Sequence, residues 1–315
     1  MGSSVACGDV DNDGFADVIV GGPGATGRVE VHFGAAGGPP YASARLRRTL
    51  GADTSEFGFS VATGDVDTTG VVGMGVARPP DGIVDVFVGA PGDQRVYGYP
   101  GAQGRAAFVT EPAPSPPSVA PFLDDQLREP TELRFGESLL VADLDSGLGA
   151  DVVVSAPGTG NSVFVTSPPS WSVHREIVSG LGAGTSFPPR FGIGLAAVSR
   201  AGTPPTRDLL IGAPGVDSAA GAMPSLSDVG AVFVVRGSSS GPTTLGTPTR
   251  GDTALGFFGL SVGADVEGSR GGVWMVAAEP ASGIVWGLGA TGARVGPVMI
   301  RPTGSLVMAI AFGDR

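Results

Sequence analysis

The sequence is poor in the residues that build cross-linked and histidine-based sites. It has one cysteine and two histidines among 315 residues. An internal disulfide framework is therefore excluded, and a zinc site or catalytic triad built on histidine is not expected. No apolar run reaches the roughly 18 residues that a membrane-spanning helix needs, and Leu306–Phe312 is long enough only for a strand. We therefore expect no membrane insertion.

Positive charge is also scarce. Lys and Arg number 19 against 30 Asp and Glu, which gives a net charge of −11. This balance argues against nucleic acid or an anionic membrane as the main partner. Glycine (54 residues) and proline (27 residues) are abundant and spread along the chain without a collagen-like period. Such punctuation indicates many short strands and disfavours long helices, while 42% hydrophobic residues can supply a core.

The most informative stretch is an acidic loop near the N-terminus, followed by the apolar run Val18-Ile19-Val20. In this loop, residues 9–17, acidic side chains occupy the first, third, fifth and ninth positions, and Gly14 supplies the bend. Alternate acids in a tight loop bring their oxygens to one point, as Ca²⁺ requires. The predicted calcium ligands are the side chains of Asp9, Asp11, Asp13 and Asp17 and the backbone carbonyl of Phe15.

The loop is not an EF-hand. Its twelfth position, where an EF-hand has a bidentate Glu, is Val20, and both flanks have the character of strands. The alternative is an acidic β-turn that binds nothing, but four closely spaced carboxylates would then repel one another. The sequence therefore predicts a calcium loop between two β-strands, with a structural rather than catalytic ion, because the motif holds no general base or nucleophile.

Around this loop a longer pattern recurs in five units: Phe-Gly (Met1-Gly2 in the first unit), a strand, a loop that is acidic in the early units, a strand, Gly-Ala-Pro and a third strand. Such regular repetition of one pattern along the chain is typical of radially repeated β-structure. The Phe-Gly pairs are Phe57-Gly58, Phe135-Gly136, Phe191-Gly192 and Phe258-Gly259. The Gly-Ala-Pro positions are Gly21-Gly22-Pro23, Gly89-Ala90-Pro91, Ser155-Ala156-Pro157, Gly212-Ala213-Pro214 and Ala278-Glu279-Pro280. The predicted units are 2–56, 57–134, 135–190, 191–256 and 257–306, with a partial sixth at 307–315, in one domain.

The acidic loops of the later units are less complete. In the second unit Asp65 and Asp67 are followed by an insertion that delays the next aligned acid to Asp85. The third unit keeps acids at the first, third and ninth positions (Asp143, Asp145 and Asp151), with one carboxylate fewer than the first loop. The fourth and fifth units lack an acidic cluster, so we expect no metal there.

The recurring order Phe-Gly, Gly-Ala-Pro, with an Asp-rich loop interposed, resembles the FG-GAP repeat of the integrin α-subunit β-propeller. This resemblance implies an all-β propeller of four-stranded antiparallel blades, with calcium loops between first and second strands and partner-binding loops on the opposite face. A seven-blade ring would need about two more units. The chain could therefore be an incomplete ring that self-association or another chain completes, or an irregular ring of five or six blades.

The resemblance implies a non-enzymatic, calcium-stabilised protein-interaction or adhesion module, secreted or at the cell surface. No signal peptide is visible in the sequence, so this location depends on the resemblance. The alternatives are a lectin-like propeller that binds glycans and the accessory domain of a secreted hydrolase. The integrin-ligand tripeptide Arg250-Gly251-Asp252 also occurs, but its Asp aligns with Asp53 of the first unit, so the repeat itself accounts for it.

Overall fold

The computed structural model consists of short strands, in agreement with the all-β prediction. Within the residues it describes there are 19 strands and no helix, and hence no helix long and apolar enough to cross a membrane. The described residues are 2–24, 27–37, 43–46, 56–66, 81–101, 134–145, 147, 149–158, 161–167, 174–178, 190–199, 206–219, 225–242, 245–264, 275–289 and 293–300.

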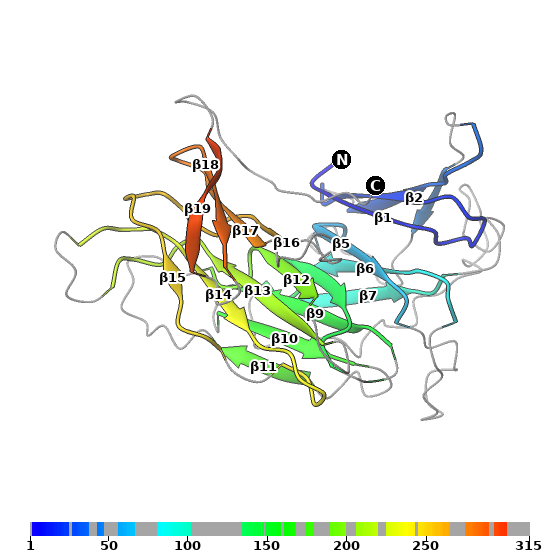
Figure 1. The fold of residues 1–315 in the computed structure, drawn as a ribbon. Helices are drawn as coiled ribbons and strands as arrows, with labels where there is room; N and C mark the ends of the chain where they lie inside the picture. The colour runs from blue at the N-terminus through cyan, green and yellow to red at the C-terminus, as the bar shows by residue number, and fades with distance from the viewer. Residues whose placement is uncertain are drawn as a thin grey trace. The chain divides into compact units, whose positions relative to one another are not determined.

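The strands form five antiparallel sheets in which neighbours in the sheet are neighbours in sequence (Figure 1). The first sheet contains β1 (Ser4–Gly8), β2 (Asp17–Gly22), β3 (Arg28–His32) and β4 (Ser43–Leu46), and the second contains β5 (Ser60–Gly64), β6 (Asp85–Ala90) and β7 (Arg95–Tyr99). The third contains β8 (Leu139–Ala142), β9 (Asp151–Ala156), β10 (Ser162–Thr166) and β11 (His174–Val178). The fourth contains β12 (Leu195–Ser199), β13 (Arg207–Ala213), β14 (Ala231–Val235) and β15 (Thr249–Arg250), and the fifth β16 (Val262–Ala264), β17 (Met275–Glu279), β18 (Ile284–Leu288) and β19 (Arg294–Ile300).

Four of the sheets thus have the four strands that the family resemblance implies, and the second has three among the described residues. The partial sixth unit, 307–315, lies outside the described residues. The unit boundaries, the number of blades and the closure of a ring stay predictions.

The chain divides into two compact units. Unit 1 comprises Met1–Ala142, Leu148–Ala156 and Phe164–Arg175, and unit 2 comprises Asp143–Gly147, Pro157–Val163 and Glu176–Arg315. Each has its own buried apolar clusters. Ile19, Phe57 and Val88 belong to one cluster of unit 1, and Leu210 and Phe258 to one cluster of unit 2.

The Phe-Gly pair forms the turn that starts a sheet. Gly58 has a φ of 86°, a left-handed conformation that glycine adopts without steric cost. Its N–H donates to the carbonyl of Gly89 in its own sheet at 3.1 Å, and the N–H of Phe59 donates back to the carbonyl of Glu56 at 3.0 Å. The same two bonds occur at Gly192 of the fourth sheet, with Gly212 and Arg190 as the acceptors.

The residue before each Phe-Gly pair is left-handed as well, although it is never glycine in the described repeats. These residues are Glu56, Arg134, Arg190 and Phe257, with φ between 52° and 64°. Across two neighbouring sheets, Nη1 of Arg134 lies 3.2 Å from Oε2 of Glu56. The guanidinium of Arg134 also lies over the ring of Phe59, 5.0 Å from its centroid.

The carbonyl of this turn packs directly on the Gly-Ala-Pro glycine of the preceding sheet. A Cβ added to Gly21 would lie 2.2 Å from the Gly58 carbonyl oxygen, and one added to Gly212 would lie 1.9 Å from that of Gly259. Next to the first contact, Ser4 Oγ donates to the Gly58 carbonyl at 3.2 Å. Only a residue without a side chain allows this approach. The two halves of the FG-GAP pattern are therefore the two sides of one contact between sheets.

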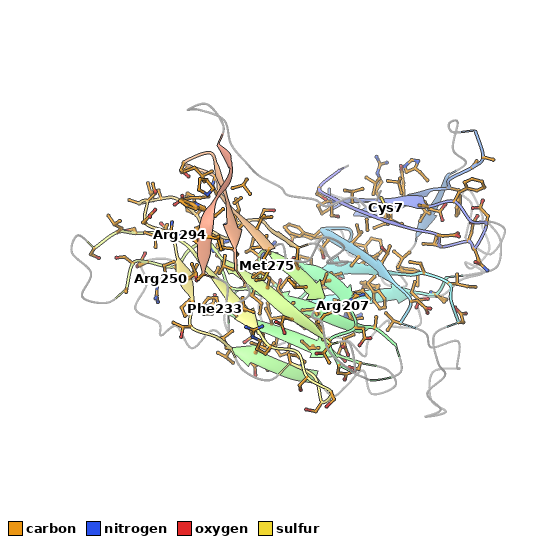
Figure 2. The ribbon with its side chains drawn as sticks, in the orientation of Figure 1. Cys7, Arg207, Phe233, Arg250, Met275 and Arg294 are labelled. Carbon is orange, nitrogen blue, oxygen red and sulfur yellow. The ribbon has the colours of Figure 1, made fainter. Side chains whose placement is uncertain are left out.

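The phenylalanine of the pair is the buried anchor of the same joint. Phe57 is 1% exposed, and its ring meets that of Tyr97 edge to face at a centroid distance of 5.4 Å. The rings of Phe191 and Phe233 (labelled in Figure 2) also meet edge to face, at a centroid distance of 5.2 Å. Edge-to-face contacts of this kind stabilise aromatic pairs beyond the area that they bury.

A buried aspartate lies at the start of the second strand in three of the sheets. Oδ1 of Asp17 accepts from the N–H of Gly34 at 2.8 Å, where the chain has left β3. Asp85 makes the equivalent bond with Gly101 at 2.8 Å. In the fourth sheet Asp208 bonds to Gly237 at 3.0 Å, and its other oxygen pairs with Arg236. The fourth loop has no acidic cluster, so this aspartate closes the sheet whether or not the loop is a metal-loop candidate.

We expect Gly212→Ala to destabilise unit 2 by about 1–3 kcal/mol or more, because the new methyl group would overlap a backbone carbonyl of the next sheet. Gly296→Ala is the matched control, since nothing lies within 4 Å of a Cβ added there. Denaturant unfolding of both variants measures the difference. Equal unfolding free energies would contradict the close contact.

We expect Asp208→Ala to lower the free energy of unfolding by about 1–3 kcal/mol, because it removes the acceptor of the buried Gly237 N–H and one partner of the Arg236 guanidinium. The loss should be the same with calcium and with EDTA. Asp252→Ala is the control, because the Asp252 side chain is 65% exposed and its ion pair should contribute less. A loss at Asp208 that appears only with calcium present would contradict a purely structural role.

Candidate calcium loop

The first acidic loop connects β1 and β2. The strands pair in register from Ser4 with Gly21 to Gly8 with Asp17, so residues 9–16 form the connection and Asp17 opens β2. Asn12 and Gly14 are left-handed, with φ of 53° and 87°. These two residues bend the loop back over the end of the hairpin, as the position of Gly14 in the sequence predicts.

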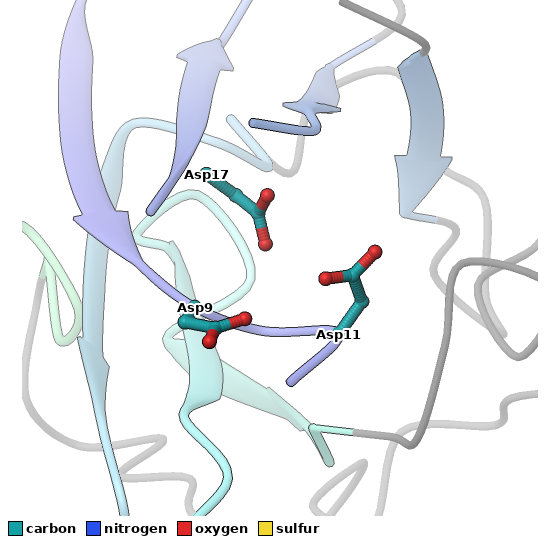
Figure 3. A group of neighbouring side chains, drawn as sticks. All are labelled: Asp9, Asp11 and Asp17. Carbon is teal, nitrogen blue, oxygen red and sulfur yellow. The ribbon is translucent and has the colours of Figure 1, made fainter. Parts of the chain in front are cut away.

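Three of the four predicted aspartates come together. Asp9, Asp11 and Asp17 each offer a carboxylate oxygen, and these oxygens all lie within 4.8 Å of one another (Figure 3). Ca²⁺ binds oxygen at about 2.3–2.6 Å, so ligands on opposite sides of one ion are about 5 Å apart. Asp11 and Asp17 are 1% and 0% exposed, and Asp9 is half-buried. The donor set therefore fits a hard divalent cation.

The other two predicted ligands are not in this group. Asp13 and Phe15 are exposed, and Oδ1 of Asp13 accepts from the N–H of Phe15 at 2.9 Å. Asp9 also stabilises the bend of the loop, because its two carboxylate oxygens accept from the N–H groups of Asp13 at 3.1 Å and Gly14 at 2.9 Å. In this structure Asp13 acts as a turn residue, and its part as a calcium ligand stays a prediction.

Negative charge is concentrated at the buried end of the loop. The pKa of Asp17 is raised, chiefly because burial disfavours its charged form and further because of the nearby Asp11 and Asp13. Hydrogen bonds from the N–H groups of Gly34 and Val10 act in the opposite direction but do not outweigh the burial. A divalent cation among these carboxylates would favour their charged forms.

The second loop is described only in part. Oδ2 of Asp65 accepts from the N–H of Gly82 at 2.9 Å, and Asp85 opens β6. Asp67 lies outside the described residues. Asp81, which the loop spacing did not single out, lies four residues before Asp85. Its Oδ1 accepts from the N–H of Ile83. A cation at Asp65 and Asp67 stays a prediction.

The third loop is divided between the two compact units: Asp143 and Asp145 belong to unit 2 and Asp151 to unit 1. Burial raises the pKa of Asp143, and the neighbouring Asp145 adds to the effect. Asp151 is 2% exposed and accepts a hydrogen bond from Ser167 Oγ. A cation held by these three residues stays a prediction.

Asp252, which follows β15, has a partner that the repeat pattern did not reveal. Oδ2 of Asp252 lies 3.0 Å from Nη2 of Arg294, which lowers the pKa of Asp252. The guanidinium of Arg294 (labelled in Figure 2) in turn lies 4.6 Å from the ring centroid of Trp286. This pairing suits a structural use of the Arg-Gly-Asp tripeptide better than an adhesive one.

Glu279 was not singled out from the sequence. It is completely buried, and its Oε2 accepts from Ser282 Oγ at 2.9 Å and Trp286 Nε1 at 3.1 Å. The signal that could have found it is its place in the repeat, because the other four units have alanine or glycine there.

Comparison with known proteins agrees with the repeat pattern. Residues 1–37 match the family model of the FG-GAP repeat. Integrin alpha-V of Gallus gallus is 28% identical over 232 residues, which are 70% of this chain and 20% of the integrin. The chain thus spans about a fifth of that relative's length.

Among solved structures, the crystal structure of BBS1N in complex with ARL6DN, soaked with lead, covers 99% of this chain and 85% of that chain at 13% identity. Its TM-score of 0.44 is too low to indicate a shared architecture or function. The repeat match and the integrin similarity together support an FG-GAP repeat protein that resembles the integrin α subunit.

Proposed function

We propose that this chain is a calcium-stabilised β-propeller domain that acts as an extracellular protein-interaction or adhesion module. The observation that carries the proposal is the group of three carboxylates, Asp9, Asp11 and Asp17, at the end of the β1–β2 hairpin. The group lies inside the segment that matches the FG-GAP repeat, and the chain resembles an integrin α subunit over most of its length.

The proposed role of the ion is structural. Asp9, Asp11 and Asp17 would hold it, and it would supply the positive charge that balances them. Asp11 and Asp17 are almost completely buried, so their charges are costly to leave unneutralised. Asp9 also fixes the loop through the N–H groups of Asp13 and Gly14. Neutralising this group would stabilise the hairpin without any chemical step, in keeping with a non-enzymatic module.

An extracellular location suits such a site, because sites of extracellular modules bind calcium with dissociation constants of about 0.1–1 mM. The proposed partner is a protein or a glycan at the face of the sheets. Self-association that completes a ring is part of the same proposal. The resemblance to integrin alpha-V supports a protein partner over a glycan.

We expect calcium to raise the melting temperature and EDTA to lower it. At a free calcium concentration about 100 times the dissociation constant, binding contributes about 2.7 kcal/mol, or about 5–10 °C for a unit of 150–250 residues. Asp11→Asn should remove most of this response, because it replaces one of the three carboxylates. Thermal melts of both proteins in calcium and in EDTA measure it.

Asp252→Asn is the control for this experiment, since Asp252 lies outside the loop and should leave the calcium response intact. A wild-type melt that is indifferent to EDTA would contradict the calcium site. Equal calcium responses of the wild type and Asp11→Asn would place the ion at another loop.

A further inference from the structure

The end of β1 and the start of the first acidic loop contact the second sheet at three consecutive residues. The carbonyl of Cys7 accepts from Thr63 Oγ1 at 2.8 Å, and the carbonyl of Asp9 accepts from the N–H of Val84 at 3.4 Å. Between them, Gly8 packs against Val84 so closely that an added Cβ would lie 2.7 Å from Val84 Cγ1. The residue that contributes a carboxylate to the loop therefore contacts the next sheet through its backbone.

This attachment recurs between the second and third sheets, within unit 1. The carbonyl of Asp65 accepts from the N–H of Ala150 at 3.4 Å. A Cβ added to Gly64 would lie 2.3 Å from Val141 Cγ1. In both cases the first acid of a loop bonds to the residue that precedes the second strand of the next sheet.

The contact at Val84 continues into the second loop. Val84 directly precedes Asp85, and Oδ2 of Asp85 accepts from the N–H of Val66 at 3.1 Å. Val66 follows Asp65, the first acid of that loop. A short chain of bonds thus runs from Asp9 through Val84 and Asp85 to the start of the second loop.

We propose that the first loop is a latch for the second sheet: a cation held by Asp9, Asp11 and Asp17 suppresses local opening at Val84, the residue before β6. The inference rests on the proposed function. The cation would fix the carboxylate of Asp9, and the carbonyl of the same residue binds Val84. Opening at Val84 that displaces Asp9 releases the ion, so calcium must suppress that opening by mass action.

Residue-resolved amide hydrogen exchange on the whole chain, with and without calcium, tests this inference. If opening at Val84 releases the ion, its protection rises about 100-fold at a free calcium concentration about 100 times the dissociation constant. Gly14 reports the loop itself. Gly237, whose N–H bonds to Asp208 in unit 2, is the control amide and should not respond. Titration calorimetry with CaCl₂ gives the dissociation constant.

Two variants separate binding from coupling. Asp11→Asn should abolish the calcium response at both Gly14 and Val84. Thr63→Val keeps the shape of the side chain but removes the bond to Cys7, so it should retain calcium binding and reduce the gain at Val84 at least threefold. Calcium binding with protection of Gly14 but no change at Val84 would overturn the latch and leave the proposed function standing. No heat of binding in calorimetry, with no response at either amide, would overturn both.

Discussion

The structure depends on one close contact, the approach of the Phe-Gly carbonyl to the Gly-Ala-Pro glycine of the preceding sheet. At Gly212 there is no space for even a methyl group, and the Gly259 carbonyl fills the position that a Cβ would take. The turn that presents this carbonyl needs a left-handed glycine, and the phenylalanine beside it is buried in the core. Two short sequence patterns, 37 residues apart at Gly21 and Gly58 and 47 apart at Gly212 and Gly259, are thus required by a single joint between neighbouring sheets.

Asp17 belongs both to the hydrogen bonding of its sheet and to the candidate site. Asp17 bonds to Gly34 as Asp208 bonds to Gly237, although only the first of these loops gathers other acids. In the first sheet, the acid that closes the sheet is therefore already present where a metal loop would use it. Adding carboxylates at the first and third positions, as in Asp9 and Asp11, converts a closing bond into a cluster of acceptors.

Much of this could be predicted from the sequence, because the signals are periodic and local. Glycine, proline and the repeat period indicated an all-β chain, and alternate acids indicated that Asp9, Asp11 and Asp17 converge. Asp13 was predicted with them, but loop spacing alone cannot show that its carboxylate bonds to the nearby N–H of Phe15. The contacts of Asp252 with Arg294 and of Glu279 with Trp286 join residues 42 and 7 positions apart whose pairing no repeat encodes. The number of blades is a property of the whole assembly, and no single repeat contains it.

The left-handed residue before each Phe-Gly pair differs from one described repeat to the next, although the turn that follows it is the same. The glycine and two backbone hydrogen bonds fix the turn, so the preceding side chain is not needed to form it. That position holds an acid in Glu56, a base in Arg134 and Arg190, and an aromatic ring in Phe257. The four described repeats therefore share one position whose side chain can change while the backbone of the turn stays the same. Successive copies of the repeat can diverge at this position without loss of the fold.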